Sequence, residues 1–187
     1  MKKTIFIFLV LISSNLLAQQ KESSIPINIG LYGAYFTQPG IKVGTEIPLK
    51  KWSNKKEITL FVSPQIGGFV RLRNHTSFIV NGDIGYKIKR NKRNFYIAPS
   101  IGLGYLLSSQ ILSQTVDLSN GDIIDKDREV RNYFLPTVNL EFGREKSKIG
   151  WYSKLSYGRK VSSKIEDSGF FALEIGIKFT IKRKHKS

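Results

Sequence analysis

The sequence contains no cysteine. It can therefore form neither a disulfide framework nor a thiolate metal site, and it has no N-terminal cysteine to carry a lipid anchor. After the first 20 residues it also lacks any run of about 18 apolar residues, the length that a transmembrane helix needs. No window shows apolar residues at helical spacing. These absences point away from helical folds, while 187 residues are enough for one domain with a substantial core.

Acidic residues are scarce, since 14 Asp and Glu stand against 30 Lys and Arg, giving a net charge of +16. Such a charge is typical of nucleic-acid-binding proteins. The N-terminus argues against that class, because Lys2, Lys3, an apolar stretch over residues 5–12 and Ala18 match a secretory signal peptide. A membrane anchor or buried helix fits less well, because the apolar stretch is too short to span a bilayer. We predict a signal peptide over residues 1–18, one domain over 19–187 and no nucleic-acid partner.

The mature chain shows eight segments in which apolar and polar residues alternate. Turn signals such as Gln38-Pro39-Gly40 separate them. Period-two alternation with turns at this spacing predicts antiparallel hairpins that follow one another in sequence. The predicted strands cover residues 26–36, 40–49, 57–71, 76–89, 94–107, 133–143, 149–159 and 170–182.

Each predicted strand has one face that carries no charge. In the last segment, for example, Leu173, Ile175 and Ile177 share one face, while Glu174 and Lys178 share the other. The polar faces of the strands are rich in glycine and carry charges of both signs, which can pair. The candidate lumen residues are Lys42, Glu46, Arg71, Asp83, Lys87, Glu141, Lys154, Glu174 and Lys178.

Two barrel architectures fit such strands. A soluble lipocalin-like barrel turns its apolar face inward around a ligand, whereas a membrane barrel turns it outward to lipid. A basic side chain facing lipid costs about 2–4 kcal/mol at the midplane. Turning about nine charges outward would therefore exceed the roughly 5–15 kcal/mol stability of a typical domain. The unbroken apolar face predicts an all-β fold, a closed eight-stranded antiparallel up-and-down transmembrane β-barrel with its charges inside.

An eight-stranded barrel has an interior filled by side chains, so we expect the inward charges to form a network of ion pairs. A lined ion pathway is the alternative. Three prolines inside strands, Pro64, Pro99 and Pro136, conflict with full pairing and suggest bulges. Aromatic residues at the strand ends predict two girdles at the lipid–water interfaces. One girdle comprises Tyr35, Phe78, Tyr105, Phe134, Tyr157 and Phe171, and the other Tyr86, Phe95, Phe142, Trp151 and Phe179.

The longest connection, residues 108–132, has Asn120-Gly121 at its centre, the preferred two-residue hairpin turn. It is predicted to project as an extracellular hairpin, with calcium binding by its acidic residues as a minor alternative. Export places the N-terminus in the periplasm, and an even strand number returns the basic tail, residues 182–187, to the same side. This end is strongly basic, which favours attraction to anionic headgroups of the inner leaflet. An acidic periplasmic protein is the alternative partner. The bases at this end are Lys50, Lys51, Lys55, Lys56, Lys89, Arg90, Lys92, Arg93, Arg144, Lys146, Lys148, Lys182, Arg183, Lys184 and Lys186.

Over its whole mature length the chain resembles the small eight-stranded outer-membrane β-barrels of diderm bacteria, the OmpA/OmpX-like family. Glu174, Gly176, Phe179 and Ile181 resemble the C-terminal assembly signal of that family, although Ile181 replaces the usual final aromatic residue. The resemblance implies a bacterial outer-membrane location, with outer-membrane lipids and the barrel-assembly machinery as partners. An extracellular or periplasmic protein partner stays open.

Some barrels of this size resemble the chain in fold and are lipid A deacylases that use a His-x-Ser pair. His75-Thr76-Ser77 has this spacing, which would suit a base and a nucleophile. However, the register points both side chains away from lipid, Phe78 replaces the Asn of those enzymes, and His185 lies in the tail. We predict no catalytic residue, cofactor or metal site, and a non-enzymatic structural or surface-interaction role. The alternatives are a narrow ion or small-solute channel, a lipid A-modifying enzyme and a soluble ligand-binding barrel.

Overall fold

The computed structural model describes residues 25–53, 56–71, 75–89, 94–116, 123–145, 148–162 and 168–181. The predicted signal peptide, the basic tail 182–187 and the Asn120-Gly121 turn lie outside these residues. Within the described ranges, no helix has the length and apolar character needed to cross a membrane.

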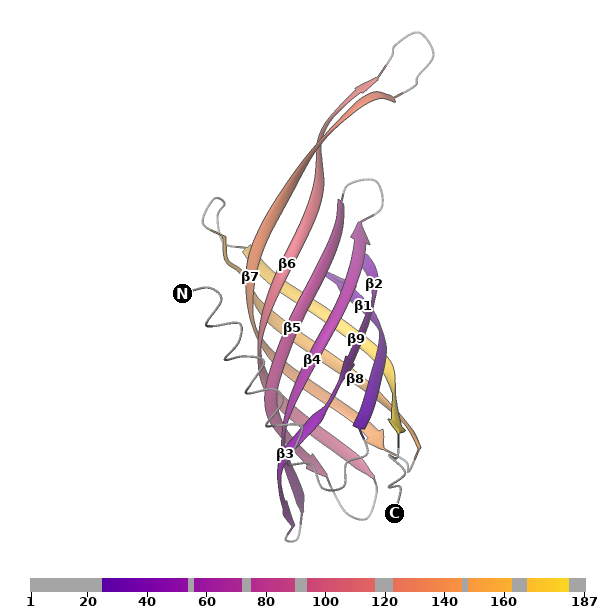
Figure 1. Ribbon diagram of the computed structural model, residues 1–187, viewed down its shortest axis with the longest axis vertical. Coiled ribbons are helices and arrows are strands. Elements are labelled where there is room, and N and C mark those ends of the chain that lie inside the picture. The colour runs from indigo at the N-terminus through magenta and orange to yellow at the C-terminus, as the bar shows by residue number, and fades with distance from the viewer. Residues whose placement is uncertain are drawn as a thin grey trace, which may run out of the picture.

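Antiparallel strands form a single closed wall, as Figure 1 shows. Strands that follow one another in sequence pair with each other, except β2 and β3; β1 also pairs with β9 and β2 pairs with β4, so the sheet closes on itself. Because β2 and β3 together occupy one place in the wall, the barrel has eight strands, and the predicted fold class is confirmed. The strands are β1 (Ile25–Ala34), β2 (Gln38–Thr45), β3 (Ile47–Ser53), β4 (Glu57–Arg71), β5 (His75–Lys89), β6 (Phe95–Val116), β7 (Ile123–Glu145), β8 (Ile149–Lys160) and β9 (Ser168–Ile181).

The second strand predicted from the sequence, residues 40–49, is wrong in detail. It is interrupted at Glu46, and its continuation β3 runs to Ser53, paired only with β4. A β-bulge between Pro48 and Lys50 shifts the register of β3 by one residue. Since a shift of one residue turns a side chain to the other face, the bulge changes which residues beyond it face outward.

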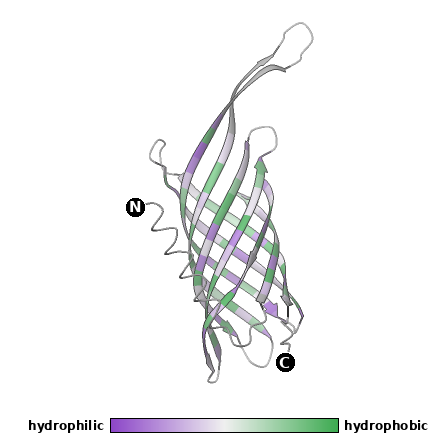
Figure 2. Cartoon of the chain, in the orientation of Figure 1, coloured by the Kyte–Doolittle hydropathy of each residue, from purple (hydrophilic) through white to green (hydrophobic). Residues whose placement is uncertain are grey.

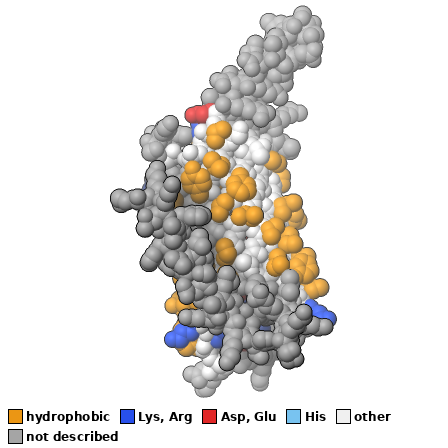
Figure 3. Space-filling model, in the orientation of Figure 1, with side chains coloured by type: hydrophobic (Ala, Val, Ile, Leu, Met, Phe, Trp, Pro, Cys, Tyr) orange, Lys and Arg blue, Asp and Glu red, His pale blue; other side chains and the backbone are white. Residues whose placement is uncertain are grey.

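The apolar faces of the strands point outward. Leu31 is 72% exposed, Ile101 63% and Val138 64%, in positions where a soluble protein would bury them. Polar and apolar residues alternate along the strands in Figure 2, and Figure 3 shows apolar side chains spread over the visible barrel wall. An exposed apolar surface of this extent is suited to hydrocarbon, which fits a transmembrane barrel and excludes the soluble ligand-binding alternative.

Two ends of the barrel can be distinguished. We call the end where β1 begins and β9 ends the lower end, and the end with the β1–β2 and β6–β7 connections the upper end. Most predicted girdle residues are exposed on the outer wall, for example Phe78 at 48% and Tyr86 at 50%. Tyr35 is an exception, because it lies in the β1–β2 turn and its hydroxyl donates to the Gly169 carbonyl over the barrel end, 2.5 Å away. Trp52, which lies between the predicted strands 40–49 and 57–71, joins the lower girdle beside Tyr86.

The three prolines inside strands lie at interruptions of pairing rather than at bulges. Pro64 lies beside the break between β2 and β3. Pro99 lies where the β5–β6 pairing is interrupted, and Pro136 lies just beyond the continuous β7–β8 pairing. Each keeps a partner on its other side, namely Gly82, Leu140 and Leu103. Each proline, which has no amide hydrogen to donate, thus lies where the pairing with one neighbouring strand is already interrupted.

The β6–β7 hairpin extends beyond the upper end of the barrel (Figure 1). Pairing of β6 with β5 ends at Gln110, whereas pairing of β6 with β7 continues to Val116 and Ile123. The outer part of this hairpin is therefore a two-stranded ribbon held only by its own two strands.

Candidate functional site

The candidate site is the barrel interior, where the structure brings most of the predicted lumen charges together. Four lysines and four carboxylates are buried among the described residues, so their formal charges balance. Burying a charge without a partner is costly, and a buried pair is tolerated only when it is well matched. The buried charges are Lys42, Lys87, Lys154, Lys178, Glu46, Asp83, Glu141 and Glu174.

A lower charge cluster lies near the chain ends. Lys178 Nζ lies 2.5 Å from Glu141 Oε1 and 2.9 Å from Glu46 Oε2. Lys87 Nζ lies 2.5 Å from the other Glu46 oxygen and 2.5 Å from Glu145 Oε1. Each of these lysines therefore bridges two carboxylates from different parts of the wall, which ties β5, β7, β9 and the interruption between β2 and β3 together across the lumen.

A middle charge cluster is centred on Asp83. Its carboxylate pairs with Lys154 and accepts hydrogen bonds from the amides of Asn139 and Asn81, each at 3.2 Å. Lys154 also donates to Gln65 Oε1 at 3.3 Å.

A second ion pair belongs to the same middle charge cluster. Lys42 Nζ lies 3.5 Å from Glu174 Oε2, and the Tyr152 hydroxyl donates to the other Glu174 oxygen.

Arg71 is the one predicted lumen charge that the structure does not place in the lumen. Its side chain is exposed at the upper end of β4, although its position in the alternation is that of an inward residue. The strand leaves the packed interior at this point, since Phe69 is the last buried residue of β4. Alternation predicts the face of a strand but not the height at which the wall ends.

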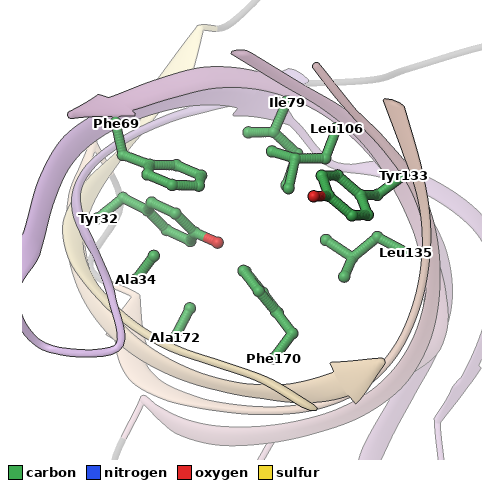
Figure 4. Close-up of a cluster of buried hydrophobic side chains, with 9 residues drawn as sticks. All are labelled: Tyr32, Ala34, Phe69, Ile79, Leu106, Tyr133, Leu135, Phe170 and Ala172. Atoms are coloured by element: carbon green, nitrogen blue, oxygen red, sulfur yellow. The ribbon is translucent and has the colours of Figure 1, made fainter. Parts of the chain in front are cut away.

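An apolar plug fills the upper part of the lumen, where the sequence analysis expected polar residues. Figure 4 shows these side chains pointing inward from the surrounding wall. A cavity of about 10 Å³ separates this plug from the middle charge cluster, room for roughly one water molecule. Lys160 Nζ lies 5.0 Å from the ring centre of Tyr35, next to the plug. The plug comprises Tyr32, Ala34, Phe69, Ile79, Leu106, Tyr133, Leu135, Phe170 and Ala172.

The sequence carries a signal for the plug. At the upper strand ends apolar residues stand in unbroken runs, such as Phe78-Ile79-Val80 and Tyr133-Phe134-Leu135. In the first run the middle residue is buried in the lumen and the two flanking residues are exposed on the outer wall. In the second run the two flanking residues are buried and the middle residue is exposed. A loss of alternation at one end of several strands therefore indicates apolar packing on both faces there.

The predicted assembly-signal residues lie on β9, the strand that closes the barrel against β1. Gly176 pairs with Gly30, and the Tyr152 ring lies over this pair, since a Cβ added to Gly176 would come within 2.7 Å of Tyr152 Cε1. Glu174 is buried in the middle charge cluster, and Phe179 is partly exposed. Ile181 pairs with Ile25 at the lower end. An added Cβ would also lie 2.3 Å from the Ile29 carbonyl oxygen, so glycine is required here because backbone and the tyrosine ring both approach it closely.

The candidate catalytic pair does not form a site open to lipid. Ser77 is buried in the lumen and its hydroxyl donates to Ser108 Oγ at 2.9 Å. His75 lies above the girdle, outside the membrane-spanning part, with its Nε2 3.3 Å from Gln38 Oε1. Burial lowers the pKa of His75, and the nearby positive charge of Lys160 acts in the same direction. Within the described residues no group of three potential metal ligands is found.

Comparison with known proteins places the fold. The structure is similar to Neisserial surface protein A (NspA), with a TM-score of 0.56 and 7% identity over 86% of this chain and 99% of that chain. It is similar to the outer membrane enzyme PagL, with a TM-score of 0.51 and 10% identity over 83% of this chain and 99% of that one. The chain has the fold of the small eight-stranded outer-membrane β-barrels. At these identities the likeness to both proteins concerns the fold alone. No protein-family model and no curated protein sequence matches the chain.

Proposed function

We propose that this protein is a bacterial outer-membrane surface protein: a closed, non-conducting, non-catalytic barrel that displays the β6–β7 hairpin outside the cell. The observation that carries the proposal is the ribbon formed by the ends of β6 and β7 above the barrel. A signal peptide over residues 1–18 and the barrel-assembly machinery would bring the chain to this membrane. The names of the fold neighbours, a surface protein and an outer membrane enzyme, support the same location.

Location and orientation can be tested by cysteine labelling. Because the sequence contains no cysteine, a single introduced cysteine is the only thiol in the protein that can react. Val130 is 66% exposed on the upper part of β7, and a Val130→Cys variant would report on that end. We expect a membrane-impermeant maleimide to label it on intact cells. A matched Lys56→Cys variant at the lower end should be labelled only after the outer membrane is permeabilised. The reverse pattern would contradict the proposed orientation.

The filled interior supports the non-conducting part of the proposal against the channel alternative. An ion would have to pass the apolar plug and two layers of paired charges. In planar bilayers the purified, heat-modifiable protein should give no conductance steps beyond those of detergent alone. Stable, reproducible unit steps would instead support the channel.

The enzyme alternative is tested on the candidate nucleophile. Because Ser77 is buried against Ser108, we expect lipid A from cells that produce the protein to have an unchanged mass. A mass loss that disappears in a Ser77→Ala variant would overturn the non-catalytic assignment. A correctly folded, heat-modifiable Ser77→Ala protein is the required control.

A further inference from the structure

Arg144 faces the lipid side of the barrel at the lower end, between two aromatic girdle residues. It pairs with Phe95 of β6 on one side and with Trp151 of β8 on the other. The guanidinium carbon lies 5.5 Å from the centre of the Phe95 ring, and the two ring centres are 6.3 Å apart. The side chain belongs to the outward row, because the neighbouring Gly143 is buried toward the lumen.

Lys50 reaches the same lipid-facing surface because of the β-bulge in β3. Beyond the bulge Lys50 pairs with Leu60, a residue of the outward row of β4. Lys50 Nζ lies 5.3 Å from the ring centre of Trp52, and Trp52 lies 6.3 Å from Tyr86 of the lower girdle. Two cations from different parts of the wall thus lie against girdle aromatics at the same lower end.

Neither cation is neutralised by the protein within the part of the chain that the structure describes. Arg144 Nε is buried and donates no hydrogen bond. Its sequence neighbour Glu145 turns the other way and pairs with Lys87 and Lys89. No carboxylate of the described residues pairs with Arg144 or Lys50, so their charges are available to an anionic group of the surroundings.

We propose that Arg144 and Lys50 bind the phosphate groups of anionic phospholipids in the leaflet at the lower end, the periplasmic leaflet. Aromatic girdles lie at the level of the headgroups, so a cation on such a ring meets phosphate oxygens. A guanidinium can bind a phosphate through two N–H groups, and each basic residue near an anionic surface adds to the attraction. The inference depends on the membrane location proposed above.

A lipid fits these positions better than an acidic periplasmic protein. Arg144 and Lys50 face the hydrocarbon side, whereas Lys51 pairs with Thr59 of the inward row and faces the barrel mouth. A protein that binds the lower end from the periplasm would contact the mouth and therefore Lys51. Lys51 is thus a matched control, since it is adjacent to Lys50 and carries the same charge, but its side chain is on the opposite face of the strand.

The experiment measures lipid preference directly. The full mature chain is folded into bilayers of equal parts phosphatidylcholine and phosphatidylglycerol with identical acyl chains, and retained lipids are counted by native mass spectrometry. We expect phosphatidylglycerol to be enriched on the protein. Arg144→Gln and Lys50→Gln should each reduce the enrichment by about fivefold, whereas Lys51→Gln should leave it unchanged. Arg144→Lys should keep part of the effect, because it keeps the charge but not the two-point contact.

Heat-modifiability of each variant shows whether it has folded, so a folding defect is not read as a lipid effect. Equal retention of the two lipids by the unmodified chain, or an equal loss on Lys51→Gln, would overturn the headgroup proposal and leave the membrane location standing. Failure of the unmodified chain to fold into any bilayer would instead overturn the location.

Discussion

At the scale of single residues, the interior depends on charges that cannot be removed one at a time. Asp83 and Lys154 are each about 2% exposed and pair in the middle charge cluster. A matched buried ion pair contributes little to the stability of a protein. Removing one partner is costly, however, because the other charge then stays buried without a partner.

We predict that Lys154→Met lowers the free energy of unfolding by about 3–5 kcal/mol, because Asp83 then remains buried without its cation. Urea unfolding in lipid vesicles measures this change. The double variant Lys154→Met with Asp83→Asn should recover much of the loss, since both charges are then removed together. Lys51→Met, at an exposed position, should change stability by no more than about 0.5 kcal/mol. Losses that simply add in the double variant would rule out the pairing.

A second prediction concerns glycine at the seam between β1 and β9. A Cβ on Gly176 would lie 2.3 Å from the Ile29 carbonyl oxygen, so Gly176→Ala must displace backbone and should cost about 1–3 kcal/mol. The matched control is Gly82→Ala, whose Cβ would meet no atom within 4 Å. Because Gly176 is also part of the predicted assembly signal, refolding of purified protein separates the two roles. A defect seen only in cells would assign the residue to assembly rather than to packing.

At the scale of strands, alternation predicted most of the wall but not its irregular features. Three features follow from a period of two: the faces of the strands, the contact that closes the barrel between the first and last strands, and the mostly lipid-facing positions of the aromatic residues. This period can be followed residue by residue along the sequence. The bulge that turns Lys50 and Trp52 outward has no sequence signal of this kind, because a single inserted residue is invisible in a short polar segment. The position of Arg71 depends on where the wall ends, which is set by neighbouring strands. The loss of alternation at the upper strand ends indicates the plug, but it does not show how inward side chains such as Phe69 and Phe170 pack against one another.

The β6–β7 hairpin provides the prediction at this scale. Gln110 and Glu129 face each other, so residues 111–128 can be replaced by a two-residue Asn-Gly turn. We expect the shortened protein to keep its heat-modifiability and its stability to within about 1 kcal/mol, since the described residues of the removed part pair only with each other and loop length has a weak energetic effect. Loss of the folded band on a gel would show that the ribbon supports the barrel. Retention of the barrel together with loss of a surface phenotype would assign function to the hairpin.

At the scale of the whole molecule, the barrel is organised from one end to the other. Apolar packing closes the upper end, and two charge clusters fill the middle and lower lumen. At the lower rim, two cations that pair with no carboxylate of the described residues lie on aromatic rings. The proposed binding of Arg144 and Lys50 to lipid phosphates would account for part of the high positive charge without a nucleic-acid partner. The same arrangement gives the molecule two different ends in an otherwise regular cylinder.

Spin labels on the outer wall can show whether the apolar faces of the strands meet lipid. Single cysteines at Ile97, Ile101 and Leu103 of β6 carry a nitroxide in a bilayer, and its collisions with oxygen and with a water-soluble nickel complex are measured. We predict strong collision with oxygen and little with nickel at all three positions, because these side chains are exposed on the outer wall. Preferential collision with nickel, or protection from both reagents as in a packed interior, would contradict it.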